Sequence, residues 1–214
     1  MRKVFYSFHY TEDVMRVMVV RNMGVIEDER TVQPNPWEQV RRTGESAIKS
    51  WIDNTMDKCS CVVVLIGEHT YQRKWVRYEI KRAWNTGKGL FGIYIHNLDP
   101  VNKAIARYGK QGENPFSCFD VREVRITPFV YDSPSINLSN IVPVYNPNKS
   151  DAYNEIKSNV SSWVEKAISA RQQNRASECS MNDKARRPCL HGEAAFGGDG
   201  VRIFALTIPS LIHQ

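Results

Sequence analysis

The chain has 214 residues, which is enough for one domain of about 150 to 200 residues and an appendage. Hydrophobic residues make up 42% of it and charged residues 24%, as in an ordinary soluble globular protein. The formal net charge of +6 is compatible with an anionic partner. Lys and Arg are interspersed with Asp and Glu along the chain, so no basic arm is present and nucleic acid is not an expected partner.

The cysteines and the apolar runs exclude other classes. Five cysteines are an odd number, and they lack the paired spacing of a metal site. The amino terminus is charged and has no apolar run long enough for a signal peptide. No segment approaches the ~20 apolar residues of a membrane span. We therefore expect a cytoplasmic protein with no metal site and no membrane contact.

Strands and helices are predicted to alternate from the start of the chain. Residues 4–8 (VFYSF) have strand character, and apolar residues at helical spacing predict a helix over 12–21. Gly24 ends that helix, because glycine commonly follows the last helical residue. Residues 24–26 form a candidate short strand, and residues 27–36 form a polar loop that contains two prolines.

The middle of the chain has the clearest periodicity. Apolar residues at helical spacing predict a helix from 37 to 56 that is interrupted at Gly44. Residues 59–66 (CSCVVVLI) predict a buried strand, because apolar side chains fill both of its faces. Residues 74–84 predict a helix, and residues 89–95 (GLFGIYI) predict another strand.

The last part of the domain is less regular. After a polar stretch that reaches Asp120, residues 124–130 predict a strand, which Pro128 places at an edge of the sheet. An amphipathic helix over 153–167 closes the pattern. Alternating strands and helices imply right-handed crossovers and a mostly parallel sheet. We expect a three-layer, flavodoxin-like α/β domain over residues 1–170.

The remaining residues, 171–214, read as a separate tail. Residues 171–200 are polar and aperiodic, which is typical of disorder. Residues 201–208 (VRIFALTI) have strand character, but the sequence shows no obvious partner that would complete a sheet. The tail has no predicted function.

Candidate functional residues follow two predicted strands, where ligands usually bind in an open α/β sheet. Trp75 and Glu79 are four residues apart, so they share one face of the predicted helix. An aromatic wall beside a carboxylate could hold a ribose and stabilise positive charge that develops on it. Ser7, Phe8 and His9 end the first strand and could position the same ligand.

Ordinary structural interpretations compete at each of these positions. Glu79 lies among basic residues, and such charge runs are usually solvated. Trp75 could simply pack in the core, and a loop histidine such as His9 is more often a satisfied structural group. Strand alternation sends Ser7 and Phe8 to opposite faces of the sheet, so these residues cannot all line one pocket.

Several segments, taken in order, resemble one known family. The chain is similar to the TIR-like family of bacterial and archaeal proteins, including the TIR-like component of Thoeris anti-phage defence systems. The similarity covers most of residues 3–170 and excludes the tail. The segments that carry it are residues 3–9 (KVFYSFH), 21–24 (RNMG), 51–53 (WID), 62–67 (VVVLIG), 73–80 (RKWVRYEI) and 89–97 (GLFGIYIHN).

The resemblance implies an activity. Enzymes of the TIR superfamily cleave NAD, and their catalytic glutamate follows a Trp by four residues, so Glu79 would be the catalytic residue. Ser7, Phe8, His9 and Trp75 would help bind NAD, which would be the substrate, and no cofactor would be permanently bound. In Thoeris-type systems the product is a cyclic ADP-ribose isomer that activates a separate effector protein.

Other functions stay open at this point. Many TIR domains only bind other TIR domains, so the alternative is a non-catalytic module that assembles through the loop at 27–37. A nucleotide or nucleic-acid sensor rests on the net charge alone and ranks last. The sequence contains no G-x-G-x-x-G, no phosphate-binding G-x-x-x-x-G-K-[ST] and no G-x-S-x-G, which argues against the enzyme classes that carry them.

Overall fold

The computed structural model describes residues 2–23, 44–99, 109–123, 134–173, 177–182 and 204–208. Within these ranges, four α-helices and three short 3₁₀ turns connect two sheets. In chain order the described elements are β1 (Arg2–Ser7), α1 (Tyr10–Arg21), α3 (Glu45–Asp57), β2 (Cys61–Ile66), η1 (Thr70–Gln72), α4 (Lys74–Asn85), β3 (Gly89–Tyr94), η2 (Pro115–Cys118), β4 (Phe119–Glu123), β5 (Ile136–Asn137), η3 (Leu138–Asn140), β6 (Val144–Tyr145), α5 (Ala152–Gln173), β7 (Ser177–Met181) and β8 (Phe204–Ile208).

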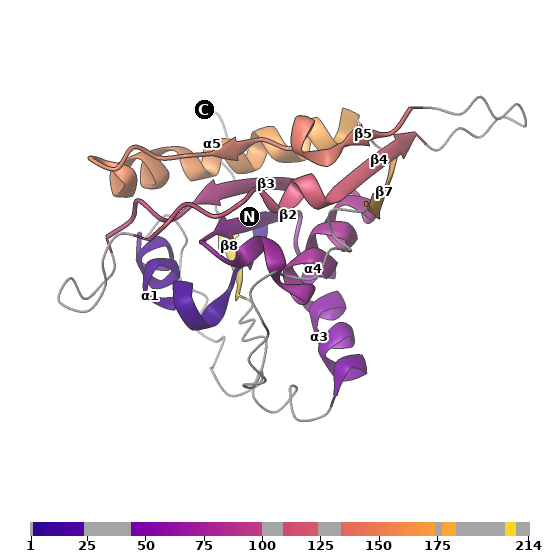
Figure 1. The fold of residues 1–214 in the computed structure, drawn as a ribbon, viewed down its shortest axis with the longest axis horizontal. Coiled ribbons are helices and arrows are strands. Elements are labelled where there is room, and N and C mark those ends of the chain that lie inside the picture. Colours follow the sequence, from indigo (N-terminus) through magenta and orange to yellow (C-terminus); the bar gives the residue numbers. More distant parts are fainter. Residues whose placement is uncertain are drawn as a thin grey trace, which may run out of the picture.

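The main sheet has the strand order β6-β3-β2-β1-β8. Its first four strands are parallel, and β8 pairs with β1 in the antiparallel direction. Helix α5 runs along one side of this sheet, while α3 and α4 lie on the other (Figure 1). The predicted α/β fold with a mostly parallel sheet, flavodoxin-like and TIR-like, is confirmed.

The central strand β2 explains why the sheet is covered on both faces. All six of its side chains, the sequence CVVVLI, are buried. Alternate residues point to opposite faces. Val62, Val64 and Ile66 therefore join the core formed with α3 and α4, whereas Val63 and Leu65 join the core formed with α1 and α5.

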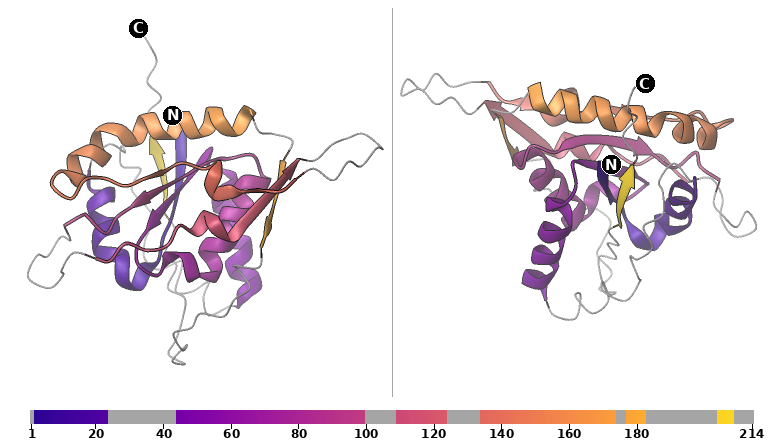
Figure 2. Two further views of the ribbon diagram at one scale, coloured as in Figure 1. Left: turned by 45° about the horizontal axis from the view of Figure 1, so that its top comes forward. Right: turned by 180° about the vertical axis from the view of Figure 1, so that it is seen from behind.

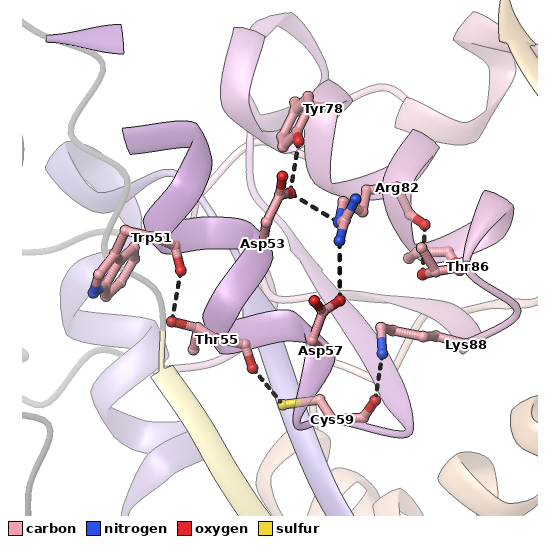
Figure 3. A network of polar contacts seen from close by, with 10 residues as sticks. Trp51, Asp53, Thr55, Asp57, Cys59, Tyr78, Arg82, Thr86 and Lys88 are labelled. Atoms are coloured by element: carbon pink, nitrogen blue, oxygen red, sulfur yellow. Dashed lines mark hydrogen bonds and ion pairs between the residues drawn. The ribbon is translucent and has the colours of Figure 1, made fainter. Parts of the chain in front are cut away.

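Helix α4 is fixed between the sheet and α3. Its apolar face is buried against the sheet through Val76, Ile80, Ala83 and Trp84, as the sequence predicted. On its outer face the Tyr78 hydroxyl donates to Asp53 Oδ1 at 2.6 Å. Arg82 bridges to Asp53 at 2.8 Å and to Asp57 at 3.0 Å, which ties α4 to α3 (Figure 3).

A small antiparallel sheet, β5-β4-β7, lies beside α4 in both views of Figure 2. Phe119 and Val121 of β4 and Cys179 of β7 are buried in the core that α4 also enters. The carbonyl oxygen of Trp84, near the end of α4, accepts hydrogen bonds from Nε of Arg171 at 3.1 Å and from Nη2 at 2.8 Å. The end of α5 and the small sheet therefore both support the helix that carries Glu79.

The tail contributes to both sheets. Helix α5 extends to Gln173, and residues 177–181 form β7, so the structure differs there from the disorder expected for 171–200. The strand expected within 201–208 is confirmed over Phe204–Ile208, and β1 is the partner that the sequence did not reveal. The boundary between a 1–170 domain and a 171–214 tail stays a prediction.

Other expectations meet the structure only in part. The polar stretch before Asp120 contains the turn η2 and the start of β4. The candidate strand at 24–26, the loop at 27–36, the helical residues 37–43 and the strand at 124–130 lie outside the described residues. Among the described helices, none combines the length and the apolar character that crossing a membrane requires.

Candidate active site

Glu79 lies on the buried side of α4, in its second turn. Its side chain is 0% exposed, between the fully buried Val76 and Ile80. Neither carboxyl oxygen has a hydrogen-bond partner among the described residues. Burying a carboxyl group without a partner costs stability, so this glutamate is not the solvated helix residue that its basic neighbours suggested.

Ser7 is the polar group that faces Glu79. It ends β1 beside Val64 of β2 and is 0% exposed. Phe5, two residues earlier, packs in the core shared with α4, so strand alternation sends Ser7 to the side of Glu79. The structure thus brings together these two predicted site residues.

The environment of Glu79 favours its neutral form. Burial raises the pKa of Glu79 to about 8, and the nearby Ser7 hydroxyl opposes that rise only partly. The hydroxyl is close enough to affect the pKa, yet the two groups do not meet the geometry of a hydrogen bond. Both groups therefore have hydrogen-bonding capacity left for a ligand.

His9 lies two residues beyond the end of β1 and is 2% exposed. Its Nδ1 is buried and has no hydrogen-bond partner among the described residues. Burial, together with the nearby basic groups of Arg73 and His69, lowers the pKa of His9 to about 4. His9 is therefore neutral near pH 7, and it lies near two basic residues of the connection between β2 and α4.

Phe8 lies away from Ser7 and Glu79, whereas Trp75 lies one turn before Glu79 on α4. Phe8 is fully buried in the core of α1 and α5, on the opposite face of the sheet from Ser7. Trp75 is 7% exposed and packs edge-on against Tyr78, with ring centres 6.0 Å apart. The roles of Ser7, Phe8, His9 and Trp75 in binding NAD stay predictions.

Trp75 also lines a groove between α3 and α4, most of whose residues are charged or polar in type. Lys49 and Asp53 of α3, and Tyr78 and Lys81 of α4, form much of its walls. Glu79 and Ser7 are not among the residues that line it. The groove therefore lies on the outer face of α4, away from the buried carboxyl group.

Polar residues that the sequence did not single out gather near the same ends of β1 and β2. Asp13, Arg16 and Thr70 are buried at 4%, 9% and 0% exposure. Asp13 and Arg16 lie in α1, a helix that the sequence predicted from the spacing of its apolar residues and not from its charged ones. Thr70 lies in the short turn η1. The sequence feature that could have indicated Asp13 and Arg16 is a charged residue on the inward side of an amphipathic helix, where charged side chains are rare.

The donor set does not suggest a metal. Among the described residues, no three His, Cys, Asp or Glu side chains are grouped closely enough to hold a metal ion. The cysteines at 59, 61, 118 and 179 are free thiols buried in the core. The described polar groups around Glu79 and His9 are a hydroxyl group and basic side chains.

Part of the chain is similar to known proteins. Residues 5–100 match the family model described as the TIR-like domain of Thoeris protein ThsB. A protein of Bacillus cereus (strain MSX-D12) named "Putative cyclic ADP-D-ribose synthase ThsB1" is 35% identical over 123 residues. That match covers 54% of this chain and 61% of the relative, so the chain spans about three fifths of the relative's length. The resemblance to the TIR-like family is confirmed.

Proposed function

We propose that this chain, whose residues 5–100 form a TIR-like domain of the Thoeris ThsB type, is an enzyme that consumes NAD. It would cleave the bond between nicotinamide and ribose and make a cyclic ADP-ribose-type signal in anti-phage defence. The observation that carries the proposal is the carboxyl group of Glu79, buried beside Ser7 with no hydrogen-bond partner among the described residues. The name of the 35% identical relative agrees with it.

The chemistry requires one well-placed carboxylate. Cleavage of a glycosidic bond passes through a ribosyl centre with oxocarbenium character. Nicotinamide leaves as a neutral molecule, so no strong general acid is needed. The ionised carboxylate of Glu79, in a site from which water is excluded, would stabilise the positive charge at the ribose. Ser7 and His9 would orient the substrate through the hydrogen-bonding atoms that lack partners among the described residues.

The attacking group decides the product. If water attacks, the product is ADP-ribose; if a group of the same substrate attacks, the product is a ring. Glu79 and Ser7 are both 0% exposed, and a site that keeps water out favours attack from within the substrate. This burial supports cyclisation over hydrolysis.

The wider proposal follows from the family. NAD would be a substrate and no cofactor would be permanently bound, while a separate effector protein would respond to the product. Self-assembly through TIR-like surfaces, and a cytoplasmic location, belong to the same proposal. A purely non-catalytic module is less favoured, because a surface that only binds proteins gains nothing from a buried carboxyl group that the described part of the chain leaves without a hydrogen-bond partner.

Release of nicotinamide tests the proposal. NAD is incubated with concentrated wild-type protein and with Glu79→Gln, and the products are separated by chromatography and weighed by mass spectrometry. We expect wild-type protein to release nicotinamide and Glu79→Gln to release none, because the amide cannot carry the negative charge. A cyclic product is lighter than ADP-ribose by the mass of one water molecule.

Glu165→Gln is a matched control, because Glu165 is a half-exposed residue of α5 that pairs with Arg2 at 3.0 Å. It should release nicotinamide as the wild type does. Circular dichroism must show that all three proteins are folded. Equal release by folded Glu79→Gln and wild type would remove Glu79 from the mechanism, and absence of release from concentrated wild type would favour the non-catalytic module.

A further inference from the structure

The candidate site lies on two loops, and a side-chain contact joins the second loop to α1, the helix that follows the first. The first loop leaves β1 at Ser7 and enters α1 near His9. The second leaves β2 at Ile66 and reaches α4 through η1. Backbone pairing between β1 and β2 extends to Ser7 and Val64, so beyond these residues other contacts must hold the loops together.

The contact is between Thr70 and Asp13. Thr70 Oγ1 lies 3.4 Å from Asp13 Oδ2 and 3.4 Å from the carbonyl oxygen of Leu65, and it accepts a hydrogen bond from the Gly67 amide at 2.9 Å. A hydroxyl group has a single proton to donate, and either the Asp13 carboxyl group or the Leu65 carbonyl oxygen can accept it. Thr70 therefore links the amide of the second loop to a carboxylate on α1.

Gly67 and Gly112 show how closely the second loop, α1 and the segment before η2 approach one another. A side chain at Gly67 would overlap the carboxylate of Asp13, and a side chain at Gly112 would overlap the carbonyl group of Gly67. The Gly67 peptide is therefore enclosed between α1 and the segment that precedes η2. Asp13 itself is held by the first turn of α1, where its amide donates to the His9 carbonyl at 3.3 Å.

We propose that Asp13 and Thr70 are positioning residues that set the separation between Ser7 and Glu79. Asp13 lies one turn after His9, and Thr70 lies one turn before the start of α4. Removing their contact frees the second loop, and with it the start of α4, to move relative to the end of β1. The proposed role in turnover rests on the proposed function, whereas the effect on Ser7 and Glu79 does not.

The pKa of Glu79 measures that separation directly. The Ser7 hydroxyl lowers this pKa against the effect of burial, and these are the two influences on it within the described residues. The pKa is followed by carbon-13 NMR of glutamate-labelled protein, with the Glu79 signal assigned from Glu79→Gln. Wild type is compared with Thr70→Val, which keeps the shape of the side chain but loses its hydroxyl, and with Thr70→Ser, which restores the hydroxyl.

We expect the pKa of Glu79 in Thr70→Val to rise toward its value in Ser7→Ala, and Thr70→Ser to return it to the wild-type value. Thr55→Val is the matched control, because the Thr55 hydroxyl donates to the Trp51 carbonyl at 2.8 Å on α3. It should leave the pKa unchanged. If Thr70→Val does not fold, Thr70→Ala removes the same hydroxyl with less crowding.

Turnover gives a second measurement. Nicotinamide release by Thr70→Val should fall at least about tenfold in kcat with KM changed less than about twofold, because misplacement by a fraction of an ångström weakens transition-state contacts most. An unchanged or lowered pKa of Glu79 in folded Thr70→Val overturns the positioning role. Absence of release from wild type overturns the proposed function alone, since the NMR comparison does not depend on turnover.

Discussion

The carboxyl group of Glu79 faces the hydroxyl group of Ser7 at the carboxyl ends of the parallel strands, and both are fully buried. Strand alternation places Ser7 on this side of the sheet, and helical spacing turns Glu79 toward it from α4. Because burial raises the pKa of Glu79 to about 8, the free protein holds a neutral carboxylic acid near pH 7. Any chemistry that needs the anion must therefore depend on pH.

The first prediction concerns the rate. The proposed function uses the ionised form of Glu79, so it predicts that kcat/KM for nicotinamide release rises with pH and levels off above about 8, the pKa of Glu79 in the free protein. Ser7→Ala should shift the midpoint to higher pH, since the hydroxyl that lowers this pKa is lost. Steady-state rates measured across this range check both. A profile without a rise toward pH 8 in wild type would contradict the assignment.

The second prediction concerns stability. The folded-state pKa of Glu79, about 8, lies above its ordinary value of 4.5, so the folded protein binds the proton more tightly. Below about pH 4.5 the shifted pKa does not lower the free energy of unfolding. The loss of this free energy grows to roughly 5 kcal/mol by pH 8, at about 1.4 kcal/mol per pKa unit.

Glu79→Gln removes this loss because the amide does not ionise. Its free energy of unfolding, measured in urea, should therefore fall less between about pH 5 and pH 8 than that of wild type. Parallel pH dependence in the two proteins would mean that Glu79 is solvated in the folded state.

The third prediction is that His9 makes the protein less stable toward acid, whereas Glu79 makes it less stable toward higher pH. Its folded-state pKa of about 4 lies below the ordinary value of 6.5, so the unfolded chain takes up a proton that the folded protein does not. Stability is therefore lost as the pH falls from about 6.5 toward 4. His9→Gln should show a smaller loss over this range in the same urea experiment. An identical acid-side slope in the variant and wild type would place His9 in contact with solvent.

The sequence predicted the parts of the fold that depend on local pattern. The run at 61–66 identified β2, the helical spacing at 74–84 identified α4, and their alternation with the neighbouring elements identified the parallel sheet. It did not predict the small sheet. Strands β4 and β7 pair across about 60 residues of sequence, Asp120 with Ser180, and no local periodicity reports such a pairing.

The candidate site was predictable in its centre but not in its surroundings. The four-residue spacing and the family resemblance identified Glu79, and alternation anticipated that Ser7 and Phe8 diverge. Asp13 and Thr70 were missed, because their importance comes from a contact between residues 57 positions apart. A buried hydrogen bond between two loops depends on tertiary structure, which residue type and local spacing do not encode.

The last prediction concerns the link between α4 and the tail. The Asn85 side chain donates from Nδ2 to the Cys179 carbonyl at 3.2 Å and accepts from the Cys179 amide at 2.8 Å. The Asn85 side chain thus satisfies the backbone N–H and C=O groups of Cys179, as a neighbouring strand would. Asn85→Ala removes both bonds and should destabilise the docking of β7 by about 1–3 kcal/mol.

Thiol labelling can measure this loss, since Cys179 is 0% exposed and burial raises its pKa to about 12. Opening of β7 exposes the thiol, so Asn85→Ala should label at Cys179 roughly 5- to 150-fold faster, as the free energy of docking implies. Mass spectrometry of the labelled peptides separates Cys179 from the other cysteines. Asn159→Ala, which removes one hydrogen bond within α5, should label at the wild-type rate. An unchanged rate at Cys179 in Asn85→Ala would mean that packing of β7 against β4 and the core, rather than Asn85, holds the tail beside α4.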